Sequence, residues 1–151
     1  MGVRLLETIT PWDVAYVVRH MRQVDMNELI AFTGQSPYQV LEESVEHSAF
    51  TRLALRDGQP AALFGFVPLP TPGSAMPWMV GTPAASGDAA NLTRIARRVI
   101  DEARQAFPYL VNFVDARNKA AVRWLRYMGF TVHDPEPQGV LGLPFHRFEM
   151  V

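Results

Sequence analysis

Four basic residues lie close together in the last third of the chain and could bind an anion. Arg117, Lys119, Arg123 and Arg126 fall within one stretch that contains no acidic residue. Such a local excess of positive charge on a short helix could hold phosphate groups. A solvated helix face is the other interpretation, and charge alone favours it.

Other reactive side chains are absent or scattered. The 151 residues include no cysteine, which excludes a disulfide framework, a thiolate zinc site and a cysteine nucleophile. The four histidines lack the close pairing of most histidine metal sites, so no metal is expected. The net charge of -1 argues against nucleic-acid binding, and no apolar run is long enough for a membrane span. These features predict a soluble protein of the cytoplasm.

The first third of the chain reads as one strand followed by two or three helices. The strand is expected at Val3–Ile9, and three short polar residues mark helix starts: Thr10, Asp25 and Ser36. The segment Asp25-Met-Asn-Glu28 has the form of a capping box. Asp25 is therefore expected to cap its helix, with Glu28 as its partner.

The middle of the chain reads as strands. Phe50–Arg56 and Pro60–Val67 flank a turn at Asp57-Gly58, which predicts an antiparallel hairpin. A short apolar strand at Trp78–Val80 follows a loop that is rich in proline.

The remainder alternates helices and strands. Apolar residues from Leu92 to Phe107 line one helix face, and Tyr109–Val114 is the continuous apolar run of a buried strand. Asn118 is expected to cap a further helix that Gly129 ends. Two strands joined by a proline-rich link complete the chain: Phe130–His133 and Phe145–Met150. This order implies a single α/β domain over residues 1–151, with helices packed on a mixed sheet.

The helix between Asn118 and Phe130 carries a resemblance to a known family. A strand that leads into an Asn-x-x-Ala helix ending in Gly-Phe resembles the GNAT N-acetyltransferase superfamily. The likeness covers roughly residues 50–151 in the order of elements. It implies the GNAT fold, with a mostly antiparallel mixed sheet of about 6–7 strands and about 4 helices. It also implies acetyl-CoA or CoA as the bound small molecule.

Four segments carry a narrower resemblance, 77–82, 111–118, 122–125 and 142–148, together with His20-Met-Arg22 near the start. They are similar to a phage and prophage branch of GNAT-like proteins that includes the internal virion protein A of short-tailed phages. This branch implies a protein made in the cytoplasm of a bacterial host. It opens an alternative function, in which a non-catalytic scaffold is packaged in the virion and has other virion proteins as partners.

The GNAT resemblance also implies where the cofactor would bind. Backbone groups of Met79, Val80 and Gly81 would pair with the pantetheine arm in a gap between two parallel strands. Ser86 and Gly87 would form a small nest of amides for the pyrophosphate. On the last helix the resemblance assigns cofactor contacts to three residues: Asn118, Ala121 and Leu125.

Two features depart from the GNAT pattern. The family's phosphate loop has the form Arg/Gln-x-x-Gly-x-Gly/Ala, whereas this chain has no Arg or Gln at the start of 83–88. Asp88, at the predicted helix start, would compete with a pyrophosphate for the helix terminus. The tyrosine that many GNAT enzymes carry seven residues after the asparagine is replaced by Leu125, which cannot transfer a proton. Tyr127 is expected to face elsewhere.

No general base stands out, and catalytic residues stay unassigned. Glu28 and Asp115 could accept a proton from an amine, but a capping partner and a turn residue are their simpler roles. Trp12, Trp78 and Trp124 are expected in the core. An N-acetyltransferase, a scaffold without catalysis and a CoA-binding regulatory domain all remain open, as do the acceptor and the oligomeric state.

The strand gap offers a way to tell these functions apart. An enzyme is expected to keep an open cleft between the strands near Val80 and Val114. A structural protein would instead fill that gap with side chains such as Trp78, Phe113 or Trp124.

Overall fold

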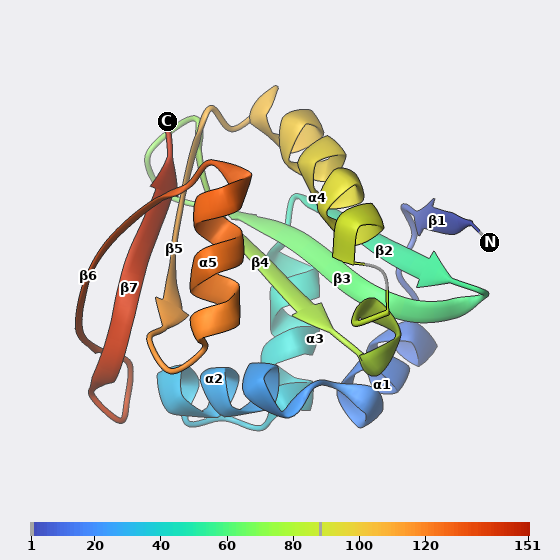
Figure 1. Cartoon of the computed structure of the whole chain (residues 1–151), viewed down its shortest axis with the longest axis horizontal. Coiled ribbons are helices and arrows are strands. Elements are labelled where there is room, and N and C mark those ends of the chain that lie inside the picture. The colour runs from blue at the N-terminus through green and yellow to red at the C-terminus, as the bar shows by residue number, and fades with distance from the viewer. Residues whose placement is uncertain (1, 88) are drawn as a thin grey trace.

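The computed structural model describes residues 2–87 and 89–151, which form one seven-stranded sheet in the order β1-β2-β3-β4-β5-β7-β6 (Figure 1). Neighbouring strands are antiparallel except for β4 and β5, which are parallel. The strands are β1 (Val3–Leu6), β2 (Phe50–Arg56), β3 (Gln59–Pro68), β4 (Ser74–Gly81), β5 (Tyr109–Asp115), β6 (Thr131–Gln138) and β7 (Leu143–Met150).

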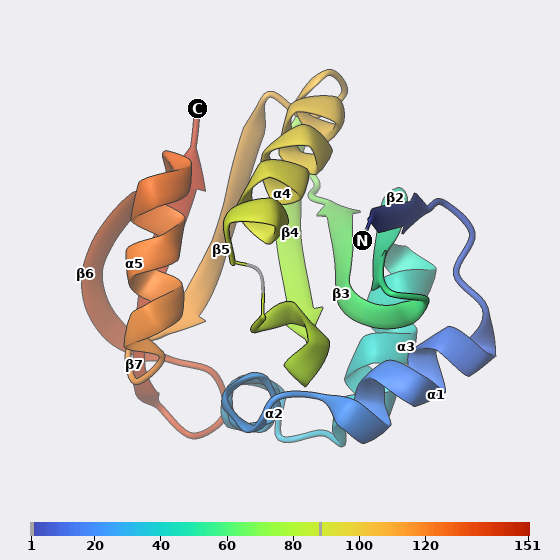
Figure 2. The ribbon, with the colours of Figure 1, turned by 45° about the vertical axis from the view of Figure 1, so that its right-hand side comes forward.

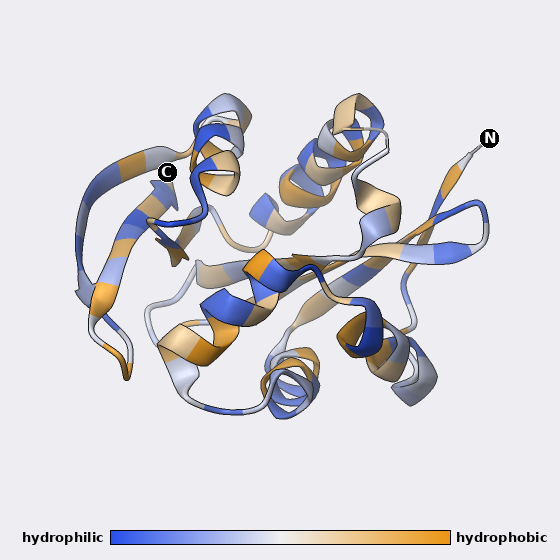
Figure 3. Cartoon of the chain, turned by 60° about the horizontal axis from the view of Figure 1, so that its bottom comes forward, coloured by the Kyte–Doolittle hydropathy of each residue, from blue (hydrophilic) through white to orange (hydrophobic). Residues whose placement is uncertain are grey.

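Helices cover both faces of this sheet (Figures 2 and 3). One layer holds α4 (Ala89–Arg104) and α5 (Lys119–Met128), and a 3-10 turn, η1 (Pro83–Ala85), joins β4 to α4. The other layer holds α1 (Pro11–His20), α2 (Gln23–Thr33) and α3 (Pro37–His47). Within residues 2–87 and 89–151, no helix is long and apolar enough to cross a membrane, and no three His, Asp or Glu side chains gather as a metal site would require.

Local capping signals define most helix ends as predicted. Thr10 and Asp13 form a reciprocal capping box at the start of α1. The Ser36 hydroxyl accepts a hydrogen bond from the amide of Gln39, and Asn118 caps α5. Gly129 ends α5 in the left-handed region, at φ 105°.

The predicted capping box at the start of α2 is wrong. The helix begins at Gln23, and its N-cap, Arg22, makes no side-chain capping bond. Asp25 and Glu28 lie inside the helix, where their spacing of three residues places them on one face. That face is turned toward the ends of β4 and β5.

Two strands are longer than the prolines in them suggested. β4 begins at Ser74 and continues through Pro77, and β6 continues through Pro135 and Pro137. At Pro77 the backbone nitrogen faces β5, with which β4 pairs only at Ser74 and Ala75. Pro135 and Pro137 lie on β6, which is an edge strand. Proline is tolerated at both kinds of position because no ladder hydrogen bond is lost there.

The parallel strands β4 and β5 separate along their length (Figure 2). They pair only at their first residues, Ser74 with Tyr109 and Ala75 with Leu110. Beyond this point they form no further ladder pairs within the described residues. The sheet therefore contains a gap that widens toward the carboxyl ends of both strands.

Candidate active site

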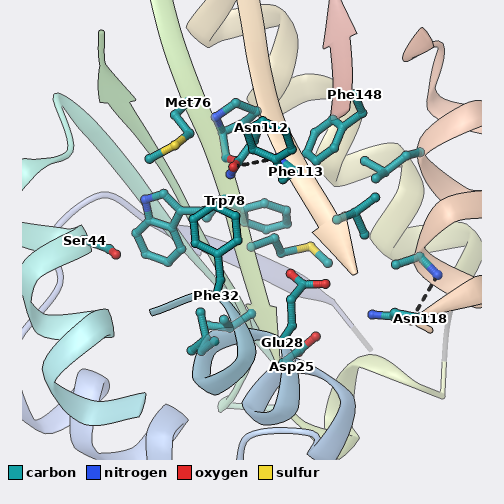
Figure 4. Close-up of a pocket in the computed structure, with 18 of the residues that line it drawn as sticks. Asp25, Glu28, Phe32, Ser44, Met76, Trp78, Asn112, Phe113, Asn118 and Phe148 are labelled. Carbon is teal, nitrogen blue, oxygen red and sulfur yellow. Dashed lines mark hydrogen bonds between the residues drawn. The ribbon is translucent and has the colours of Figure 1, made fainter. Parts of the chain in front are cut away.

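A cavity of about 310 Å³ passes through the sheet where β4 and β5 diverge (Figure 4). Val80 and Val114, one from each strand, both line it, so the cleft is open as expected for an enzyme. Trp78, Phe113 and Trp124, the side chains that a filled gap would need, form its walls. Residues from both layers of helices complete the lining.

The narrow end of the gap is closed by the side chain of Asn112. Its amide nitrogen donates to the carbonyl of Pro77 on β4, at 2.6 Å. Its amide oxygen accepts from the backbone N–H of Phe113 on β5, at 2.7 Å. Asn112 thus replaces the backbone ladder with one side-chain bridge at the point where the ladder stops.

Backbone groups of β4 face the gap at every second residue. The Pro77 carbonyl does so through Asn112, and the Gly81 N–H and carbonyl bond to Asp25 and to the Arg22 N–H, at 2.8 and 3.0 Å. Since alternate residues of a strand direct their polar groups to the same side, the amide and carbonyl of Met79 face the gap as well. Met79 is therefore the position from which β4 can pair with a molecule in the gap.

The wide end of the gap is held by the two carboxylates of α2. Asp25 accepts from the Gly81 amide of β4 and pairs with Arg22, whose Nε lies 3.0 Å from it. Glu28 accepts from the Asp115 amide of β5, also at 3.0 Å. Because both strands have lost their ladder partners here, α2 supplies the acceptors that their amides need.

Burial gives Glu28 unusual acid–base behaviour. Loss of solvent raises its pKa to about 7; the Asp115 amide opposes the shift, and the charges of Asp25 and Asp115 add to it. Burial also raises the pKa of Asp25, but the neighbouring Arg22 opposes that shift. Glu28 is thus a carboxylate in the cavity that exchanges its proton near neutral pH.

Asp115 has the turn role that its sequence position suggested. It accepts from the backbone amide of Arg117 at 2.9 Å and pairs with the guanidinium of the same residue. Burial alone would raise its pKa, but the hydrogen bonds and charge of Arg117 outweigh burial and lower it. This pair occupies one of the four clustered basic residues. Lys119, Arg123 and Arg126 are exposed on α5, as expected of a solvated helix face.

α5 presents three of the predicted cofactor residues to the cavity: Asn118, Ala121 and Leu125. The Asn118 side-chain oxygen also accepts from the Ala121 amide at 3.3 Å, so one residue caps the helix and lines the site. Tyr127 points away, is 67% exposed, and lies under the guanidinium of Arg97. Leu125 therefore lines the cavity at the position that carries the tyrosine in many GNAT enzymes.

Of the predicted strand residues, Met79 and Val80 line the cavity, whereas the Gly81 amide is held by Asp25. Ser86 and Gly87 do not line it and lie in the loop after η1. Asp88 lies outside the described residues, so its competition with a phosphate stays a prediction.

Arg56 is a feature of this loop that the sequence analysis missed. Its guanidinium donates to the Ala84 carbonyl at 3.1 Å. It also lies against Gly87, where an added Cβ would come within 2.2 Å of the guanidinium nitrogen. Gly87 therefore leaves room for a cation beside the loop amides. An arginine from the end of β2 therefore lies beside the loop whose own sequence lacks one.

The tryptophans do not all belong to the core. Trp12 is 84% exposed, so its prediction as a core residue is wrong. Trp78 and Trp124 line the cavity and donate their indole N–H groups to Ser48 and Thr93, each at 2.9 Å. These bonds fix both rings against the walls.

Comparison with known proteins identifies the fold. No protein-family model matches the chain, and no curated protein is detectably similar in sequence. Among solved structures, a ribosomal-protein-alanine N-acetyltransferase from Brucella melitensis matches with a TM-score of 0.73 and 18% identity over 98% of this chain and 99% of that one. Spermidine N-acetyltransferase from Vibrio cholerae, in complex with CoA and spermine, matches with a TM-score of 0.72 and 13% identity. This match covers 98% of this chain and 94% of that one. A GNAT-family acetyltransferase from Streptococcus pneumoniae matches with a TM-score of 0.66 and 16% identity over 98% of both chains. The chain therefore has the GNAT fold.

Proposed function

We propose that this protein transfers an acetyl group from acetyl-CoA to a primary amine, with Glu28 as the general base. The observation that carries the proposal is a cavity through the β4–β5 gap that contains a carboxylate with a pKa of about 7. A base of this pKa is half deprotonated near neutral pH and can still hold a proton taken from an amine.

The residues around the gap fit the cofactor. The backbone of Met79 would pair with an amide of the pantetheine arm, beside Val80 and Gly81. The Asn118 side-chain nitrogen would hydrogen-bond the arm, and Ala121 and Leu125 would pack against it. The Gly81 backbone is already engaged, because its amide donates to Asp25 and its carbonyl accepts from the Arg22 amide.

The loop after η1 supplies a different kind of phosphate site from the family's loop. Ser86 and Gly87 would offer backbone amides, and Arg56 would offer a guanidinium at the same place. Arginine binds phosphate through charge-assisted hydrogen bonds, which neutral backbone amides alone cannot provide. Arg56 is therefore assigned the role of the absent Arg or Gln.

The chemistry requires few protein groups. Bound acetyl-CoA supplies a thioester carbonyl that an amine can attack. Glu28 takes a proton from the attacking nitrogen as the C–N bond forms and the C–S bond breaks. Leu125 donates no proton, so the leaving sulfur takes one from Glu28, which has just received it, or from water.

Calorimetric titration with acetyl-CoA and with CoA tests this proposal directly. Micromolar binding is expected, together with release of free thiol when an acceptor amine is added. Titration with pantetheine, which lacks the phosphates of CoA, is the control: it measures binding in the gap without binding at the loop. Absence of heat at millimolar cofactor would overturn the proposal.

The second candidate is a non-catalytic GNAT scaffold, encoded by a phage or prophage and packaged as an internal virion protein. Leu125 at the position of the proton donor favours it, as does a loop without Arg or Gln. On this hypothesis CoA does not bind, and the protein is found in purified virions. Detection by mass spectrometry of virion proteins is the corresponding test.

A further inference from the structure

The half of the cavity beside α2 and α3 has apolar and largely aromatic walls (Figure 4). Six side chains form most of them: Phe32, Leu41, Met76, Trp78, Phe113 and Phe145. The Phe32 ring lies 5.9 Å from that of Phe113 and 5.2 Å from that of Phe145. Such walls bind an apolar group of matching size and provide nothing for a charged chain.

One free carboxylate faces this apolar space. Arg22, Asp25 and Glu28 are the charged residues that line the cavity. Arg22 and Asp25 are paired at 3.0 Å, and Asp25 also holds the Gly81 amide. Glu28 accepts from the Asp115 amide, and no arginine of residues 2–87 or 89–151 is bonded to it, so its second oxygen can accept from one ammonium group.

The polar groups on the same walls are already engaged. Ser44 and Thr33 donate their hydroxyl hydrogens to the carbonyls of Val40 and Leu29, each at 2.7 Å. The Trp78 N–H is bonded to a serine outside the lining. A carboxylate placed against these walls would therefore find these hydroxyl and indole donors already used, and an unpaired buried charge is strongly unfavourable.

From this arrangement we infer that the acceptor is a primary monoamine with an aromatic or branched apolar body on a short alkyl arm, without a carboxylate. The inference rests on the proposed acetyl transfer and narrows its acceptor. A polyamine would bury a second ammonium group without a partner, and a free amino acid would bury its carboxylate in the same way.

A panel of four acceptors tests this inference: 2-phenylethylamine, phenylalanine, spermidine and a short peptide with N-terminal alanine. Each is titrated calorimetrically into the protein with and without CoA, and thiol release from acetyl-CoA is then measured. We expect kcat/KM for 2-phenylethylamine to exceed those for phenylalanine and spermidine by at least about 100-fold, the cost of burying one unpaired charge. The peptide should also react more slowly, because its polar backbone would face the same apolar walls.

The two proposals fail in different ways. If CoA binds but spermidine or the peptide is the better acceptor, the acceptor class is wrong and the acetyltransferase proposal stands. If 2-phenylethylamine binds and CoA does not, the pocket assignment stands and the transfer reaction is wrong. If CoA binds and no panel member binds or reacts, the acceptor class is also wrong.

A substitution that changes selectivity sharpens the test. Ser44→Asp would add a carboxylate to the apolar wall and is expected to improve kcat/KM for spermidine relative to 2-phenylethylamine by about tenfold. Ser44→Asn, of similar size but neutral, is the matched control and should leave the ratio near that of the parent. Thermal melting confirms that both variants fold. An unchanged ratio in a folded Ser44→Asp protein would contradict the inference.

Discussion

The half of the cavity beside α2 and α3 and the loop after η1 are built in different ways. Around Glu28 the walls are buried, the hydrogen bonds run between distant elements, and the carboxylate has a raised pKa. At Gly87 the loop departs from the family pattern, and the guanidinium of Arg56, from the end of β2, lies beside it. A loop that departs from its family motif can therefore coexist with a well-ordered cavity, because the cavity is held by contacts between elements that are distant in the sequence.

Substitution of the carboxylate gives the largest expected effect. Glu28→Gln should lower kcat for acetyl transfer by about 1000-fold, because the amine loses its proton acceptor. The glutamine oxygen can still accept from the Asp115 amide, so CoA affinity should not change. Thiol-release kinetics and calorimetry measure the two quantities.

Glu42→Gln is the matched control, because Glu42 is exposed on α3. It should react like the parent. If Glu28→Gln were as active as this control, the base would be elsewhere, and the acceptor half would be only a hydrophobic cavity.

The raised pKa of Glu28 also predicts how stability depends on pH. Its carboxyl titrates near 4.5 when unfolded and at about 7 when folded, so the folded state keeps a proton that the unfolded chain releases. The free energy of unfolding should fall between pH 4.5 and 7, by up to about 3 kcal/mol from this group.

Urea unfolding at pH 5 and at pH 8 measures this dependence. Glu28→Gln should reduce the difference between the two pH values and should be more stable than the parent at pH 8. A variant that is less active and more stable would separate a catalytic role from damage to the fold. Equal pH dependence in both proteins would contradict the assignment.

The bridge at the narrow end of the gap should have a smaller effect. Asn112→Ala leaves the Pro77 carbonyl and the Phe113 amide without partners and should destabilise the protein by about 2 kcal/mol. Asn27→Ala is the control, since Asn27 bonds only an exposed glutamine on its own helix. Comparable losses in the two variants would mean that Asn112 does not hold the strands.

The phosphate loop should be the least sensitive. Arg56→Gln should weaken CoA binding by about tenfold, since one charge-assisted contact is lost, and should leave pantetheine binding unchanged. Arg4→Gln, at an exposed position on β1, is the control. If pantetheine affinity fell equally, Arg56 would act on the fold of the loop rather than on phosphate.

Much of the fold could be predicted because its signals are local. Thr10, Ser36 and Asn118 each lie next to the amides that they cap. The Asp57-Gly58 turn joins two strands whose bounds agree with the sequence within about two residues. Predictions failed at Pro77 and Pro135, because tolerance of proline depends on which strand lies alongside.

The site was harder to predict because its contacts join distant residues. Asp25 and Glu28 have the spacing of a capping box, and the same spacing places two carboxylates on one helix face. Only the positions of Gly81 and Asp115 decide between the two roles. Arg56 reaches Ala84 from 28 positions earlier in the chain, a contact that no local pattern encodes.

The wall around Phe32 depends on the last part of the chain. The amides of Val140 and Leu141, at the turn between β6 and β7, donate to the carbonyls of Phe32 and Ala31, and Gly139 packs directly on the α2 backbone. During synthesis these partners are separated by more than a hundred residues. We therefore expect the wall around Phe32 to form late in folding, because its contacts with α2 can be made only after translation has passed this turn.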